Sequence, residues 1–76
     1  MVDVRDIGSL LEQALPGADV QVEDRGGGNH LYAHVRAPQF SGRTVVDQHR
    51  MVYAPLQHLL DDGSIHALSI RTEALG

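Results

Sequence analysis

Two stretches of alternating apolar and polar residues flank a glycine-rich connection, and this feature constrains the fold more than any other. The stretches cover residues 18–24 and 31–37, and the connection, residues 26–29, reads Gly-Gly-Gly-Asn. Alternation is the period of a half-buried strand, because successive side chains point to opposite faces of a sheet. Glycine adopts positive φ at little steric cost, so the connection suits a tight reversal. The segment therefore predicts an antiparallel hairpin with one face against a core.

Apolar residues at helical spacing lie on both sides of the hairpin. Residues 3–15 predict an amphipathic helix with Asp3 as its N-cap and Pro16-Gly17 as its stop. A second stripe consists of Val45, His49, Val52, Leu56, Leu59 and Leu60. It places His49 among core positions, where we expect its ring to bond to backbone. Pro55 removes an amide donor and clashes with the preceding turn, so we expect a kink or a split near residues 53–54.

A third strand is predicted over residues 65–72, after the turn at Asp61-Asp62-Gly63, and the last four residues are expected to fray. The order helix, strand, strand, helix, strand predicts a single α+β domain over residues 1–76. A helical crossover permits a parallel third strand beside the antiparallel hairpin. We therefore expect a two-layer αββαβ sandwich, with a three-stranded mixed sheet and the helices on one face.

Composition limits the chemistry that this chain can perform. Its 76 residues contain no cysteine, which excludes disulfides, thiol catalysis, Cys-ligated zinc and a self-sufficient thiolate site for an iron–sulfur cluster. A small core that no disulfide stabilises makes stabilisation by a partner surface more important. Five histidines remain as the best metal ligands. No serine lies in a nucleophile elbow and the glycines join strand to strand, so we expect no enzyme.

Charge and hydropathy restrict the partners and the location. The formal net charge is −4 and every one of the six basic residues is arginine, which argues against binding nucleic acid by bulk electrostatics. No apolar run approaches the roughly 20 residues that span a bilayer, and the opening residues have no apolar run. We expect a cytoplasmic protein that does not contact membranes.

Three short motifs follow one another from residue 38 to residue 70. They are Phe-Ser-Gly at 40–42, Gln-His-Arg-Met-Val-Tyr at 48–53 and Ile-His-Ala-Leu-Ser-Ile at 65–70. They resemble the F-x-G, R-H-R-x-V-Y and H-A-L-x-I elements of the BolA family, with Gln48 in place of the first arginine. The resemblance implies a topology similar to class II KH domains. Residues 53–56, Tyr-Ala-Pro-Leu, are similar to a short-loop bacterial branch of the family.

The resemblance also implies a site and a partner. His66, which opens the H-A-L-x-I element, corresponds to the histidine with which BolA proteins hold a bridging [2Fe-2S] cluster shared with a monothiol glutaredoxin and glutathione. The second ligand in the family comes from the loop between the first two strands, where His30 is the nearest candidate and His34 an alternative. Imidazole replaces thiolate at iron in Rieske centres, so this ligation is chemically sound. We expect the isolated protein to be a monomer without a cluster.

A second function is implied by the same resemblance, because some BolA proteins are described as stress-linked transcriptional regulators. DNA would then contact the turn and helix over residues 40–53, through Arg43 and Arg50. The chain lacks the G-x-x-G loop with which KH domains clamp nucleotides. The acidic balance predicts that such binding is weak at physiological salt.

Overall fold

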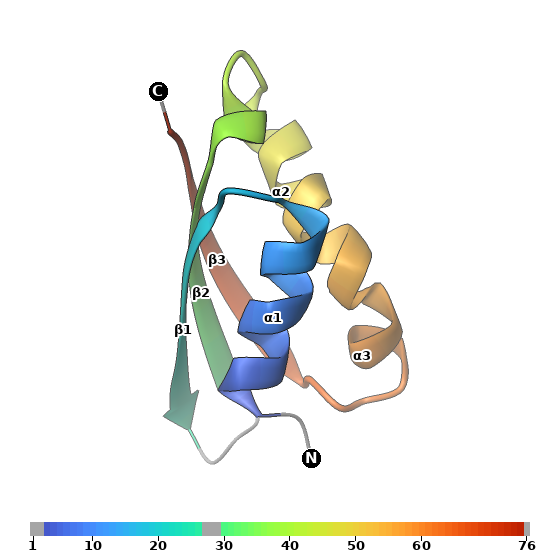
Figure 1. Ribbon diagram of the computed structural model, residues 1–76. Helices are drawn as coiled ribbons and strands as arrows, with labels where there is room; N and C mark the ends of the chain where they lie inside the picture. Colours follow the sequence, from blue (N-terminus) through green and yellow to red (C-terminus); the bar gives the residue numbers. More distant parts are fainter. Residues whose placement is uncertain (1–2, 27–29, 76) are drawn as a thin grey trace.

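The structure is a computed structural model that describes residues 3–26 and 30–75 (Figure 1). In chain order its elements are α1 (Val4–Ala14), β1 (Asp19–Gly26), β2 (His30–Ala37), the 3-10 turn η1 (Pro38–Phe40), α2 (Val45–Tyr53), the 3-10 turn η2 (Ala54–Leu56), α3 (Gln57–Asp61) and β3 (Ala67–Ala74). This order confirms the predicted α+β sandwich. Most of the predicted glycine connection, residues 27–29, lies outside the described residues.

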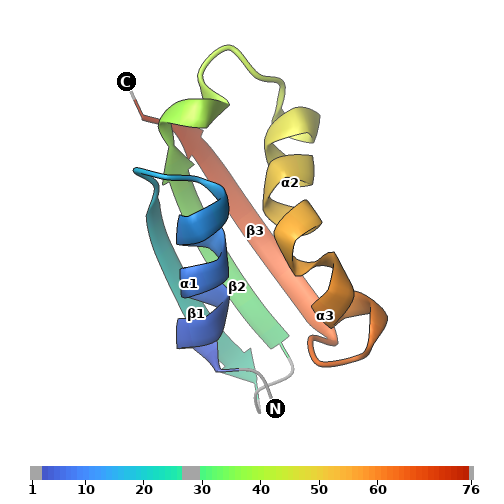
Figure 2. The ribbon, with the colours of Figure 1, turned by 45° about the vertical axis from the view of Figure 1, so that its right-hand side comes forward.

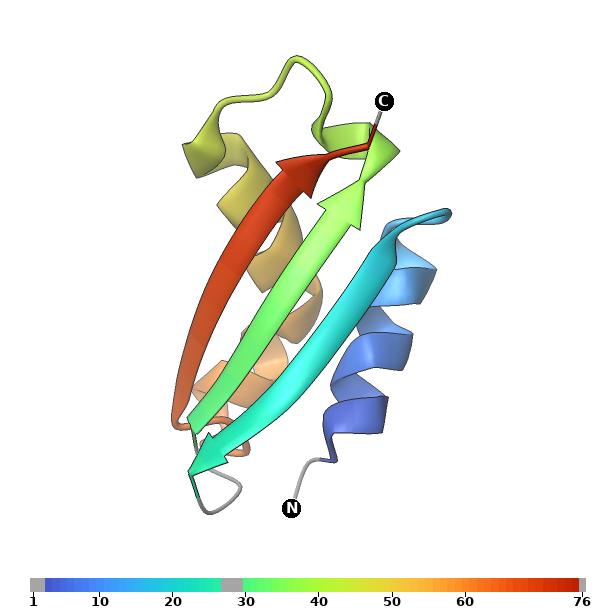
Figure 3. The same cartoon turned by 90° about the vertical axis from the view of Figure 1, so that its left-hand side faces the viewer.

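The sheet has the order β1-β2-β3, with β1 antiparallel and β3 parallel to the central strand. The register pairs Val22 with Ala33, and Ala33 in turn with Ile70. Figures 1 and 2 show all the helices on one face of this sheet. Figure 3 shows the other face without a covering element. The predicted mixed sheet with a single helical layer is therefore confirmed.

The core lies between the sheet and the helices. Its buried members come from every layer and are Ile7, Leu11, Leu15, Leu31, Ala33, Val35, Ala37, Phe40, Val52, Leu56 and Ile65. Four of them are alternate residues of β2, as expected of a central strand with one face against a core. No helix within residues 3–26 and 30–75 is long and apolar enough to cross a membrane.

The first helix begins and ends where its sequence predicts. The Asp3 carboxylate accepts the amide of Arg5 at 3.0 Å. It also accepts the backbone amide of Asp6, and the Asp6 carboxylate accepts the amide of Asp3 at 3.4 Å, and these two bonds form a capping box. Gly17 takes a φ of 84° after the last turn, a conformation that disfavours other residues. The sequence signals at both ends are local, which is why they are read correctly.

The second helical region splits at Pro55 as predicted, into α2, η2 and α3. The predicted core stripe is wrong in its first turn, because the buried positions of α2 are Gln48 and Val52 rather than Val45 and His49. Val45 is 63% exposed and His49 is half-buried. The buried stripe follows a spacing of four residues, from 48 through 52 to 56, which turns Val45 toward solvent.

The third strand starts later and ends later than predicted. It begins at Ala67, after the buried Ile65 whose amide bonds to the Leu59 carbonyl at 3.0 Å. It continues to Ala74, and the Leu75 amide donates to the Ala37 carbonyl at 3.1 Å. The prediction that residues 73–75 fray is therefore wrong. Parallel pairing with β2 supplies bonds that no local sequence signal reveals.

Candidate functional site

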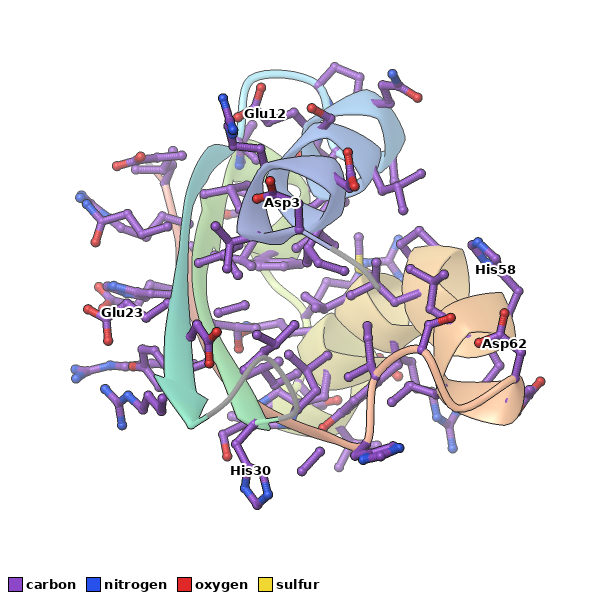
Figure 4. The ribbon with its side chains drawn as sticks, turned by 90° about the horizontal axis from the view of Figure 1, so that it is seen from below. Asp3, Glu12, Glu23, His30, His58 and Asp62 are labelled. Carbon is purple, nitrogen blue, oxygen red and sulfur yellow. The ribbon has the colours of Figure 1, made fainter. Side chains whose placement is uncertain are left out.

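The two histidines predicted as ligands lie at one end of the sheet. His30 is the first residue of β2, and its partner in the parallel register is Ala67, the residue that follows His66. Both histidines are exposed. In Figure 4 the His30 ring points away from the ends of the strands. The parallel pairing of β2 and β3 therefore brings together two residues that are 36 positions apart in the sequence.

Neither imidazole at this end is engaged by the part of the chain that the structure describes. Among the described residues, no hydrogen bond or ion pair involves the side chain of His30 or His66. In the same part of the chain, no group of three or more His, Cys, Asp or Glu side chains is placed to hold a metal ion. A [2Fe-2S] cluster takes four protein or thiol ligands. Two imidazoles fit half of that set, so the remaining ligands have to come from another molecule.

His34, the alternative ligand, has a different environment. It is half-buried on the uncovered face of β2, and its Nε2 lies 2.8 Å from the Glu73 Oε1 of β3. The hydrogen bond from His34 lowers the pKa of Glu73, and the nearby positive charges of Arg71 and Arg36 act in the same direction. In the parallel register His34 pairs with Arg71, four residues further along β3 than Ala67, which follows His66 and pairs with His30. Geometry therefore favours His30 over His34.

Arg43 and Arg50, predicted as nucleic-acid or partner contacts, lie on another part of the surface. Both are exposed, and neither forms an ion pair with any of the residues that the structure describes. Arg43 precedes α2, which begins at the end of the sheet opposite to His30 (Figure 1). Val45 and Val46, which lie between the two arginines in the sequence, are 63% and 61% exposed. The structure does not bring these arginines to the histidine end.

A buried residue that the sequence did not reveal holds this turn in place. Gln48 is 9% exposed, and its Nε2 donates to the carbonyls of Arg43 at 3.0 Å and Phe40 at 3.4 Å. Its Oε1 accepts the Thr72 hydroxyl at 2.7 Å. The side chain thus ties the turn before α2 to β3. The only signal in the sequence was that glutamine stands where an arginine was expected.

Two other residues of the same motif have structural surroundings. The Tyr53 hydroxyl donates to the Leu68 carbonyl at 3.1 Å, which joins α2 to the start of β3. The ring of His49 makes no hydrogen bond within residues 3–26 and 30–75, so the backbone bond expected for it is absent. The motif therefore contributes chiefly to the connection between helix and sheet.

Comparisons with known proteins agree with this geometry. The family model described as BolA-like protein matches residues 10–75. The chain is 36% identical over 62 residues to an uncharacterized protein in the rpoN-murA intergenic region of Acinetobacter guillouiae, which covers 82% of this chain and 72% of the relative. It is also similar to the solved structure of a BolA protein homologue from Coxiella burnetii, with 37% identity, a TM-score of 0.80 and coverage of 97% and 92%.

A plant structure extends the comparison. The BolA domain of SufE1 from Arabidopsis thaliana superimposes with a TM-score of 0.81 at 30% identity, covering 97% of this chain and 95% of that one. The family model and the solved structures thus agree on one family and one fold.

Proposed function

The chain belongs to the BolA-like protein family, and on that premise we propose that it is a non-enzymatic partner in iron–sulfur cluster trafficking. It pairs with a monothiol glutaredoxin and glutathione in the cytoplasm, and His66 and His30 ligate a [2Fe-2S] cluster that bridges the two proteins. The cluster is cargo rather than a resident group of the isolated chain.

The observation that carries this proposal is the pair of imidazoles at one end of β2 and β3 that make no hydrogen bond within residues 3–26 and 30–75. His66 lies between the buried Ile65 and the first residue of β3, so the backbone on both sides of it is fixed. His30 is held by its register with Ala67. A ligand on a fixed backbone loses little conformational freedom when it binds, which favours ligation.

The donor set determines the role of each partner. The glutaredoxin cysteine and the glutathione thiol supply two thiolates, and this chain supplies two neutral imidazoles. Replacing thiolates by imidazoles removes negative charge from the site and raises the reduction potential, as in Rieske centres. Because this chain has no cysteine, it cannot complete the ligand set alone. Cluster binding therefore requires the heterodimer.

The proposal is tested by visible-region circular dichroism of the protein mixed with a cluster-loaded monothiol glutaredoxin and glutathione. We expect a spectrum that differs from that of the glutaredoxin alone and that His66→Ala abolishes. His58→Ala is the matched control, since His58 is an exposed histidine on α3. A mixture whose spectrum is the sum of its components, or one that His66→Ala leaves unchanged, would refute the proposal.

Binding of duplex DNA is a second candidate function. It is favoured by the exposure of Arg43 and Arg50, neither of which forms an ion pair with the residues that the structure describes. Each phosphate contact by an arginine releases counterions, so the affinity must fall as salt rises. Fluorescence anisotropy with labelled duplex DNA at several salt concentrations tests this function. Binding that is micromolar or tighter and is lost in Arg50→Ala would support it, whereas equal binding by the variant would exclude this surface.

A further inference from the structure

A groove runs between α1 and the free edge of the sheet, away from both surfaces discussed so far. Its volume is about 380 Å³, and its lining residues come from α1 and β1: Val4, Arg5, Gly8, Ser9, Glu12, Val20 and Val22. Val20 and Val22 are only half-buried, although they point to the same layer as the fully buried residues of β2. The helix thus leaves apolar surface of β1 accessible.

The backbone of β1 is available along the same groove. β1 is an edge strand, because the sheet order is β1-β2-β3. An edge strand presents unpaired N–H and C=O groups on its outer side and is a template for a further strand. The register becomes irregular between Asp24 and Gly26, so regular pairing is possible along residues 19–24. Backbone donors and acceptors of β1 therefore lie beside the apolar side chains of Val20 and Val22.

Gly8 makes room for side chains above this edge. It lies on the side of α1 that lines the groove, and a Cβ built on it meets no atom within 4 Å. Glycine inside a helix costs about 1 kcal/mol relative to alanine, and no contact within the described chain explains its presence. The open space is therefore of use to another molecule rather than to the packing of α1.

The position of α1 decides which molecule fits. Figure 3, which looks onto the uncovered face, shows much of α1 beyond the free edge of β1. A second copy that paired through its own β1 would bring its own α1 against this one. An extended segment that carries no covering helix avoids this collision and lies beneath α1. The occupant that suits the groove is therefore a strand from a different protein.

Charge at the groove selects the composition of that strand. Of the two charged residues that line the groove, Arg5 lies 3.6 Å from the Asp3 carboxylate. Glu12, by contrast, forms no ion pair within residues 3–26 and 30–75. In Figure 4 Glu12 lies on the side of α1 that faces away from α2 and α3. The charge left without a partner in the groove is thus negative.

We propose that β1 and the groove bind an extended, basic segment of a partner protein, which adds to residues 19–24 as a fourth strand. Small apolar side chains of the segment contact Val20, Val22 and the space at Gly8, while a lysine or arginine faces Glu12. Backbone hydrogen bonds supply affinity and the alternating side chains supply specificity, as in other cases of strand addition. This binding does not depend on the cluster proposed above.

The test uses the full chain, labelled with ¹⁵N, and an eight-residue blocked peptide that alternates valine with lysine and threonine. We expect amide shifts that concentrate on residues 19–24 and on the groove side of α1. Gly8→Leu, which fills the groove, should weaken binding at least tenfold. Gln13→Leu is the matched control, because Gln13 is exposed on the same helix and does not line the groove; it should bind the peptide as the parent does.

Charge reversal provides a second arm. Glu12→Lys should weaken binding of the lysine peptide and strengthen binding of a peptide in which glutamates replace the lysines. The proposal is overturned if the lysine peptide causes no shifts at millimolar concentration, if the shifts lie on β3, or if Gly8→Leu binds like the parent. It is also overturned if, without peptide, raising the protein concentration doubles the apparent mass and shifts the β1 amides. A second copy would then occupy the edge.

Discussion

The two ends of the β2–β3 pair differ in how their side chains are engaged. At the end where the strands finish, His34 bonds to Glu73 at 2.8 Å, Thr72 to Gln48 at 2.7 Å and the Leu75 amide to the Ala37 carbonyl at 3.1 Å. At the end where they start, His30 and His66 make no side-chain hydrogen bond within the described residues. One end is stabilised by the chain itself, which leaves the imidazoles at the other end available to a ligand.

Histidine shows the difference most clearly, since it occurs at both ends. His34 and His30 are four residues apart on the same strand, so both point to the same face. One is engaged by a carboxylate and the other is not. Whether a histidine of β2 is engaged depends on the side chain that lies beside it on β3, as Glu73 lies beside His34, and not on the alternating pattern. Substitutions at the two ends should therefore affect different properties.

The largest loss of stability is expected from Gln48→Leu at the engaged end. The leucine leaves the Thr72 hydroxyl and the Arg43 carbonyl without this partner, whereas the Phe40 carbonyl keeps the Arg43 amide at 3.0 Å. Buried polar groups that lose a partner cost about 1–3 kcal/mol, so we expect a loss of about 2 kcal/mol in urea unfolding followed by far-UV circular dichroism. Gln57→Leu is the control, because Gln57 is exposed on α3. Equal losses in the two variants would contradict the role given to Gln48.

A smaller loss is expected from Tyr53→Phe, which removes the hydroxyl that bonds to the Leu68 carbonyl near the start of β3. A single partly buried hydrogen bond contributes about 1 kcal/mol. Urea unfolding measures the loss, and hydrogen exchange at the β3 amides tests where it arises. Faster exchange confined to the start of β3 is expected. Uniformly faster exchange would mean that the hydroxyl stabilises the whole fold instead.

The His34–Glu73 pair predicts how the engaged end responds to acid. The pKa of Glu73 is lowered in the folded protein from its ordinary value of 4.5, so the contribution of this carboxylate to stability is present above pH 4.5. It is lost as the pH falls through the lowered folded value. The midpoint temperatures of thermal unfolding of the parent and of Glu73→Gln should therefore differ at neutral pH and become equal in acid. A difference that stays constant down to acid pH would show that the charge is not involved.

The smallest effects on stability are expected at the other end, from His30→Ala and His66→Ala. Both side chains are exposed and make no hydrogen bond with any residue that the structure describes, so each change should alter the free energy of unfolding by less than about 0.5 kcal/mol. Urea unfolding of the two variants checks this. A loss above 1 kcal/mol in either would mean that the histidine stabilises the fold.

Local signals predicted most of the architecture. The N-cap at Asp3, the stop at Gly17 and the break at Pro55 depend on residues close in sequence, and each lies where the sequence places it. Errors arose where distant pairing decides the outcome. β3 extends to Ala74 because it pairs with β2, and Gln48 is buried because Thr72 reaches it from β3.

The candidate site divides in the same way. The motifs identified His66 and His30, but only the parallel register shows that they lie at one end of the sheet. The engagement of His34 by Glu73 was not predictable, because residue 73 was expected to fray. Nothing in the alternating pattern marked the half-covered Val20 and Val22 of β1 as part of a groove.

Ligation of the cluster by histidines of this chain can be measured by pulsed electron paramagnetic resonance of the reduced cluster in the complex with glutaredoxin and glutathione. With ¹⁵N-histidine incorporated only into this chain, the account predicts strong nitrogen couplings from directly bound imidazole. His66→Ala and His30→Ala should each remove one of two such couplings, and His34→Ala should leave both unchanged. A reduced cluster without ¹⁵N couplings, or one that keeps both couplings in His66→Ala or loses one in His34→Ala, would contradict the account.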